Sequence, residues 1–126
     1  MAESARWPAF GAGFPALIEV RELPGQVELC LEVTADLKWF AGHFPGEPVL
    51  PGIIQTHWAA QFARAAFDFA GQPQRIKRLK FKQVVVPPQI LVLALHQASA
   101  TEVQFGFSSN AGQHSEGRLV FADDLV

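Results

Sequence analysis

The sequence of 126 residues predicts an α+β fold, in which an antiparallel sheet curls around one long helix. Two observations support this fold class. Segments with strand-like patterns are separated from a lone helical segment, with two before it and four after it, and this separation is typical of α+β domains. The length suits one domain spanning residues 1–126, which would bury roughly two thirds of the surface of the unfolded chain.

The residues before the helix predict an N-terminal arm followed by a hairpin. Residues 1–15 mix aromatic residues with glycine and proline, which favours an irregular arm packed on the body of the domain. Residues 17–23 and 27–33 are expected to form two strands joined by a Pro-Gly turn. Apolar and polar residues alternate in the second strand, so one of its faces is expected in the core, with Val27, Leu29, Leu31 and Val33.

Residues 52–70 predict the long helix. They are rich in alanine, and Gly71 and Pro73 follow them as stop signals. At about 1.5 Å per residue the helix would be roughly 28 Å long, the length of a small domain. One side is an apolar stripe expected to face the sheet, made of Ile54, Trp58, Phe62, Ala65 and Phe69.

Four further strands are expected at residues 75–86, 90–97, 103–108 and 116–121. Turn-forming residues separate them, among them a Pro-Pro pair and an Asn-Ala-Gly sequence. Together with the first hairpin they complete the sheet that would surround the helix.

Composition excludes several classes of function. The formal net charge of −2 argues against general nucleic-acid binding, which needs many phosphate-neutralising lysines and arginines. No charge-free apolar run reaches the roughly 18 to 20 residues that span a bilayer. The single cysteine, Cys30, has no internal disulfide partner, so a cytoplasmic protein is expected. Because 49% of residues are apolar and only 17% charged, we expect a homo-oligomer whose second subunit covers apolar surface.

The most specific feature is the run Gly42-His-Phe-Pro-Gly-Glu-Pro-Val-Leu-Pro-Gly52. It places one imidazole, His43, in a loop that three prolines stiffen, and it ends where the helix begins. An imidazole titrates near neutral pH, and the unpaired N–H groups at a helix start attract negative charge. These are the groups that proton transfer next to a carbonyl requires.

With Gln61 nine residues further on, this run resembles the signature of the 3-hydroxyacyl-[acyl-carrier-protein] dehydratases of fatty-acid synthesis, which have the hot-dog fold. The resemblance extends more weakly into residues 79–88 and 116–121. It implies a homodimer with active sites at the interface, which dehydrates a 3-hydroxyacyl thioester to a trans-2-enoyl thioester. The substrate would be carried on the 4'-phosphopantetheine of acyl carrier protein, with no cofactor. No metal is expected, because His43 and His57 have no further ligand at suitable spacing.

The resemblance also implies a role for each end of the motif. His43 matches the catalytic base, and the backbone amide of Gly52 matches the group that holds the thioester carbonyl. A glycine there also permits close approach of the pantetheine-linked substrate. The residues expected to contact the substrate are Phe44, Pro51, Ile53, Trp58 and Gln61. For Gln61, a buried glutamine hydrogen-bonded to the backbone is the alternative.

His57 departs from the usual pattern, because the resembling enzymes have an aspartate or glutamate fourteen residues after the catalytic histidine. In them this acid reaches the neighbouring subunit's site and assists loss of the β-hydroxyl. An imidazole can donate a proton too, so His57 is expected to act as the acid while His43 acts as the base. A histidine here also resembles a divergent branch associated with aryl-polyene pigments. A packed helical histidine, in a protein that has lost or changed the reaction, is the alternative.

Two other functions remain open from the sequence. A hot-dog thioesterase would hydrolyse the same thioester, but those families usually supply an aspartate or glutamate from the helix, and this helix start has none. A non-catalytic subunit would bind the acyl thioester and pair with an active dehydratase.

Half of the basic residues lie within eight positions. Their clustered charge would attract an acidic acyl carrier protein, whereas a solvated strand face is the alternative for any one of them. The expected carrier-binding residues are Arg75, Lys77, Arg78, Lys80 and Lys82.

Overall fold

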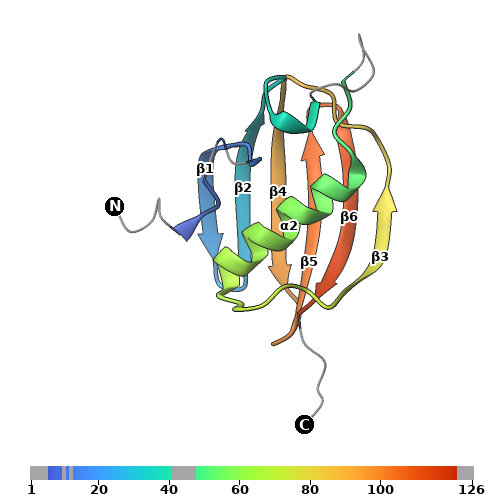
Figure 1. Cartoon of the computed structure of the whole chain (residues 1–126). Helices are drawn as coiled ribbons and strands as arrows, with labels where there is room; N and C mark the ends of the chain where they lie inside the picture. The colour runs from blue at the N-terminus through green and yellow to red at the C-terminus, as the bar shows by residue number, and fades with distance from the viewer. Residues whose placement is uncertain (1–5, 10, 12, 41–47, 122–126) are drawn as a thin grey trace.

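The computed structural model describes residues 6–9, 11, 13–40 and 48–121. In this part of the chain a curved, six-stranded antiparallel sheet packs around one long helix, α2 (Figure 1). The strand order is β1-β2-β4-β5-β6-β3, and the predicted α+β class is confirmed. The elements are β1 Ala16–Leu23, β2 Gln26–Val33, a short 3-10 helix at Lys38–Phe40, α2 Gly52–Phe67, β3 Arg75–Phe81, β4 Gln89–Gln97, β5 Glu102–Ser109 and β6 Gly112–Val120.

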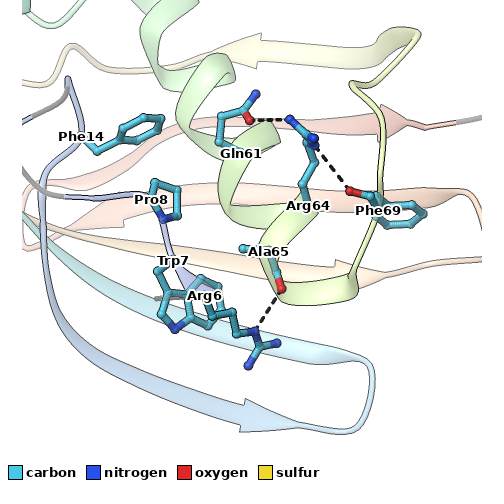
Figure 2. A pocket seen from close by; sticks show the side chains of 8 residues that line it. All are labelled: Arg6, Trp7, Pro8, Phe14, Gln61, Arg64, Ala65 and Phe69. Atoms are coloured by element: carbon cyan, nitrogen blue, oxygen red, sulfur yellow. Dashed lines mark hydrogen bonds between the residues drawn. The ribbon is translucent and has the colours of Figure 1, made fainter. Parts of the chain in front are cut away.

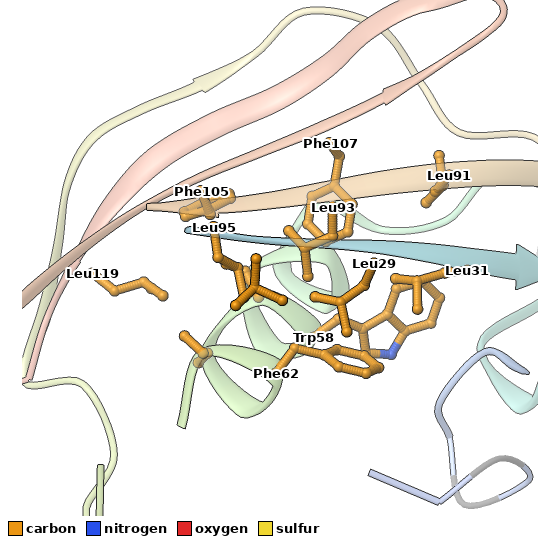
Figure 3. Close-up of a cluster of buried hydrophobic side chains, with 14 of the residues drawn as sticks. Leu29, Leu31, Trp58, Phe62, Leu91, Leu93, Leu95, Phe105, Phe107 and Leu119 are labelled. Atoms are coloured by element: carbon orange, nitrogen blue, oxygen red, sulfur yellow. The ribbon is translucent and has the colours of Figure 1, made fainter. Parts of the chain in front are cut away.

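The core lies between the concave face of the sheet and α2 (Figure 3). Trp58 and Phe62 of the helix are fully buried against leucine and phenylalanine side chains of the central strands. The alternation predicted for β2 is confirmed, because its four aliphatic residues are all buried. Each such side chain contributes about 1.5–3 kcal/mol through removal from water. The fully buried leucines of the strands are Leu29, Leu31, Leu91, Leu93, Leu95 and Leu119.

The helix ends three residues earlier than predicted. Its last residue is Phe67, and Asp68 has a left-handed backbone with φ 61°. The N–H of Phe69 then donates to Arg64 O at 3.1 Å, which closes the helix end. The Phe69 ring stacks on Phe121 at 4.0 Å between centroids, so packing against the end of β6 replaces the last helical turn.

Two strand boundaries differ from prediction by more than one residue. β3 ends at Phe81, because the following segment leaves the ladder and binds β6 differently: Lys82 N–H donates to His114 O at 2.8 Å. β6 begins at Gly112, four residues earlier than predicted, since it continues the hairpin with β5 through the pair Ser109 and Gly112. Both differences arise from contacts between residues far apart or across a turn, which strand patterns do not report.

The described residues of the N-terminal arm pack on the body of the domain. Gly13 O accepts hydrogen bonds from the indole N–H groups of Trp58, at 2.8 Å, and Trp39, at 2.6 Å. Arg6 donates to the carbonyl oxygens of Ala65 and Ala66 near the end of α2. A cation at this position also suits the negative end of the helix dipole.

Candidate active site

The start of α2 presents unpaired backbone donors. Pro51 precedes the helix with an extended backbone and provides no side-chain cap. Its carbonyl accepts the N–H groups of Ile54, at 3.0 Å, and Gln55, at 3.4 Å. Among the described residues, the N–H groups of Gly52 and Ile53 have no acceptor. Free N–H groups and the positive end of the helix dipole make this point suitable for a carbonyl oxygen that acquires negative charge.

A cavity of about 560 Å³ opens beside this helix start. One wall is the helix start with the residues before it, and the other is the end of β3 with the segment after it. Predicted residues Pro51, Gly52 and Ile53 therefore lie together, and the Ile53 side chain is 73% exposed. The lining residues are Val49, Leu50, Pro51, Gly52, Ile53, Gln55, Phe81, Lys82, Gln83 and Val84.

Phe81 explains in steric terms why a glycine begins the helix. A Cβ placed on Gly52 would lie 2.7 Å from two atoms of the Phe81 ring. The prediction from the sequence was that the substrate would use this space, but in the structure the Phe81 ring occupies it. Phe81 is 52% exposed, so it lines the cavity without being fixed in the core.

A buried polar pair fixes the helix wall of the cavity. Ser115 of β6 donates its hydroxyl to Gln55 Oε1 at 2.7 Å, and both residues are buried. Gln55, Phe81 and Ser115 were not predicted from the sequence as residues of the site. The residues paired at this bond are 60 positions apart, and no local spacing signals it.

The structure describes only one of the two histidines that are expected to act as base and acid. His43, like Phe44, lies outside the described residues. His57 is exposed on α2, its ring centroid 5.4 Å from that of Phe14, and it does not line the cavity at Gly52. Within one chain the structure therefore does not bring His57 to the Gly52 amide.

Trp58 and Gln61 also lie away from this cavity. Trp58 is fully buried in the core. Gln61 lines a separate cavity of about 420 Å³ between the N-terminal arm and α2 (Figure 2). Its amide donates to Gln72 Oε1 at 2.7 Å and accepts from Arg64 at 2.9 Å, so its partners are side chains and not the backbone.

Lys77 and Lys82 of the basic cluster bind carboxylates within the described part of the chain. Lys77 contacts Glu102 at 3.2 Å, and Lys82 contacts Glu116 at 3.2 Å. Arg118 also contacts Glu102, at 3.3 Å. The hydrogen bond from Lys77 lowers the pKa of Glu102 against the opposing effect of burial, and Arg118 lowers it further.

Two others, Arg78 and Lys80, line a cavity of about 610 Å³ together with Arg118. Arg78 lies at a bulge in β3 with a left-handed backbone, φ 54°. The Nε atom of Arg118 is buried, and it has no hydrogen-bond partner among the described residues. Arg75 stands apart from this cavity at the first position of β3.

The described residues contain no cluster of three or more His, Cys, Asp or Glu side chains that would suit a metal ion. No helix in the same part of the chain is long and apolar enough to span a membrane.

Most of the chain matches the model of one protein family. The family model described as ApeI-like (ApeI dehydratase) matches residues 19–118. The chain belongs to the ApeI-like family. The resemblance inferred from the motif is thereby confirmed, and it includes the branch to which the sequence pointed.

Curated relatives of this ApeI-like chain are named FabZ. The 3-hydroxyacyl-[acyl-carrier-protein] dehydratase FabZ of Levilactobacillus brevis is 37% identical over 78 residues, which are 56% of this chain and 53% of the relative. FabZ of Legionella pneumophila strain Corby is 33% identical over 76 residues, 52% of this chain and 51% of the relative. The chain thus spans about half the length of the curated relatives it matches.

Solved structures confirm the hot-dog fold. The dehydratase heterocomplex ApeI:P from Xenorhabdus doucetiae contains a chain similar to this ApeI-like protein, with a TM-score of 0.78 and 23% identity over 86% of this chain and 98% of the other. An uncharacterized protein from Erwinia carotovora subsp. atroseptica has a TM-score of 0.71 and 31% identity, over 90% of this chain and 99% of that chain.

Proposed function

We propose that this protein dehydrates a 3-hydroxyacyl thioester, carried on the phosphopantetheine of an acyl carrier protein, to a trans-2-enoyl thioester in fatty-acid or polyene-type synthesis. The observation that carries the proposal is the cavity at Gly52, where helix N–H groups without an acceptor among the described residues lie at the end of the His43-containing motif, in a chain of the ApeI-like family. The FabZ names of the curated relatives support the same reaction.

The proposed chemistry uses three groups and no metal or cofactor. His43 removes the α-proton, and the carbonyl oxygen becomes an enolate-like anion held by the Gly52 N–H. The electron pair then forms the α,β double bond while the β-hydroxyl departs. His57 of the partner subunit gives that hydroxyl a proton, so that water leaves. One oxyanion donor is worth about 3–4 kcal/mol of barrier, which makes the Gly52 amide a major contributor.

We place the second subunit of a homodimer along β3. This strand is an edge of the sheet and exposes Ile76, Leu79 and Phe81 by 37%, 40% and 52%. An edge strand whose basic residues alternate with exposed apolar ones offers backbone groups and apolar surface for association with another strand. Because Phe81 also lines the Gly52 cavity, a partner bound there would lie next to the reaction site. The Xenorhabdus doucetiae relative is a heterocomplex, so a mixed dimer is the other outcome to test.

Arg78 and Lys80 are the proposed contacts to the acidic carrier protein. They share a cavity with Arg118, and the other two lysines of the cluster are paired within the chain. Concentrated positive charge raises the rate of association with an acidic partner. A cytoplasmic location fits this proposal, since the one cysteine, Cys30, needs no oxidising compartment.

The reaction is tested by incubating the protein with a 3-hydroxyacyl carrier protein and following the mass of the carrier. Loss of water is the expected result. Loss of the acyl group would show a thioesterase, and an unchanged mass would indicate a binding subunit. The variant His43→Ala is expected to lose activity at least a hundredfold, on the order of a missing general base. Full activity in this variant would remove His43 from the mechanism.

The role of His57 is tested with the pair His57→Ala and His57→Glu. Alanine cannot protonate the departing hydroxyl and is expected to lower kcat by about a hundredfold, whereas a glutamic acid restores a proton donor and part of the rate. The exposed His96 on β4 offers a control, because His96→Ala is expected to leave kcat unchanged. Equal kcat values in wild type and His57→Ala would show that His57 is only a helical surface residue.

A further inference from the structure

His114 of β6 is fully buried, and both of its ring nitrogens have hydrogen-bond partners. Nδ1 lies 3.0 Å from Val84 O and 3.2 Å from Gln83 O, and Nε2 lies 2.7 Å from Ser109 Oγ. Carbonyl oxygens only accept hydrogen bonds, so Nδ1 carries the proton and Nε2 accepts from the Ser109 hydroxyl. The serine oxygen also accepts the N–H of Ala111 at 3.0 Å. One tautomer therefore satisfies the whole network.

The segment that this ring holds is a wall of the Gly52 cavity. Residues 82–84 have left the β3 ladder and line the cavity. His114 holds them twice, because its carbonyl also accepts the N–H groups of Lys82, at 2.8 Å, and Gln83, at 3.3 Å. A buried donor without its carbonyl partner, or a buried carbonyl without its donor, destabilises the fold, so this attachment favours one backbone position.

The next residue of the chain, Val85, is hydrogen-bonded to the residues just before α2. Leu50 N–H donates to Val85 O at 2.9 Å, and both residues are buried. Leu50 lies two positions before Gly52, whose N–H is the proposed oxyanion donor. The adjacent Ser115 fixes Gln55 on the first turn of the helix. Two neighbouring residues of β6 thus hold the two walls of the cavity in relation to each other.

We infer that His114 is a positioning residue for the dehydration. Its Nδ1–H fixes the backbone of Gln83 to Val85, and the Val85 to Leu50 hydrogen bond passes that position to the Gly52 amide. The ring itself does not line the Gly52 cavity. The inference rests on the proposed function for its catalytic readout, and its structural readouts are independent of it.

The matched variants His114→Asn and His114→Gln separate positioning from packing. The asparagine amide nitrogen lies where Nδ1 lies and keeps the donor to Val84 O, whereas the longer glutamine places its amide toward Ser109 and leaves the carbonyl oxygens without a donor. Both variants should lower Tm, because each removes a buried ring. We expect kcat to fall between about tenfold and about a hundredfold in His114→Gln but less than about threefold in His114→Asn, with KM little changed in both. Equal losses of kcat, or losses that follow Tm, would overturn the inference.

Two measurements test the inference independently of the dehydratase reaction, and the first of them needs no variant. Nitrogen-15 NMR of the histidine-labelled wild-type protein should show the Nδ1–H tautomer for His114, and the Nε2–H tautomer would contradict the inference. Hydrogen exchange should be faster at residues 48–55 in His114→Gln than in His114→Asn, with β2 as the internal reference. Failure of the wild type to release water would count against the proposed function alone.

Discussion

The two edges of the sheet differ in how they meet solvent. β1 carries Arg21, which contacts Glu19 at 3.7 Å and Glu28 at 3.6 Å, and its Glu22 binds Arg6 of the N-terminal arm. β3 also carries basic residues, but its exposed apolar side chains extend to the Gly52 cavity. β1 exposes apolar side chains as well, but the N-terminal arm binds it, and a bound arm leaves less of an edge open to another strand. We therefore propose that the partner binds at β3, next to the reaction site.

A charge placed on each edge in turn gives the largest expected effect. Leu79→Glu on β3 should convert the dimer to monomer and abolish dehydration, because the carboxylate would be buried at the interface. Ile18→Glu on β1, whose wild-type side chain is 54% exposed, should leave the dimer and the activity unchanged. Analytical ultracentrifugation of both variants measures the mass. A dimeric Leu79→Glu protein, or a monomeric Ile18→Glu protein, would assign the interface to the wrong edge.

The contact between β3 and α2 predicts a smaller effect at Gly52. A methyl group in Gly52→Ala would displace the tip of the half-exposed Phe81 ring, at little cost in stability, and the ring would move into the cavity. We expect kcat/KM to fall by about tenfold. In the double-mutant cycle with Phe81→Ala, the effects of the two substitutions should differ from additivity by at least about 0.5 kcal/mol, on the order seen for contacting residues. Urea unfolding and kinetics on the four proteins of the cycle measure it.

Gly71→Ala is the control for this cycle, since a Cβ there meets nothing within 4 Å. It should change neither stability nor rate appreciably. Strict additivity of Gly52→Ala and Phe81→Ala would show that the ring is not what requires glycine at the helix start.

How far the sequence predicted the molecule differs between these regions for a physical reason. The alternation in β2 and the alanine-rich helix are local patterns, and the structure has both. The end of β3 at Phe81 is set by hydrogen bonds to His114 O, about thirty positions away, and so it escaped prediction. Long-range hydrogen bonds override local strand propensity in such segments.

The same distinction holds for the candidate site. The motif ending at Gly52 is continuous in sequence, so its glycine and the following helix start could be recognised directly. The opposite wall comes from β3 and β6, and Phe81 and His114 carry no local sign of this role. His114 lies near a glycine turn, where an exposed histidine is the ordinary expectation, and only its buried partners show otherwise.

The basic residues of β3 predict a kinetic difference between substrates. Replacing Arg78 and Lys80 with alanine should raise KM severalfold for the carrier-bound substrate, while KM for a short pantetheine thioester stays the same, because only the carrier protein needs the charges. Arg21→Ala on β1 serves as the control and should change neither KM. An equal increase for both substrates would place the two residues at the thioester and not at the carrier surface.

The smallest expected effect concerns the ion pairs that connect β3 and β6 with Glu102 of β5. Glu102 of β5 binds Lys77 of β3 and Arg118 of β6, and the Lys77 hydrogen bond is the main cause of its lowered pKa. Because the pKa of Glu102 is lowered in the folded state, the ionised Glu102 stabilises the fold at every pH above its ordinary pKa of 4.5. This stabilisation is lost as the pH falls through the lowered pKa.

The Glu102→Gln protein lacks this contribution. Its urea midpoint should therefore lie slightly below that of wild type at neutral pH, and the two midpoints should converge as the solution is acidified past that point. Lys77→Met should remove most of the same pH-dependent difference. A gap between wild type and Glu102→Gln that persists unchanged in acid would mean that β3 is held to the sheet by its backbone ladder and apolar contacts alone.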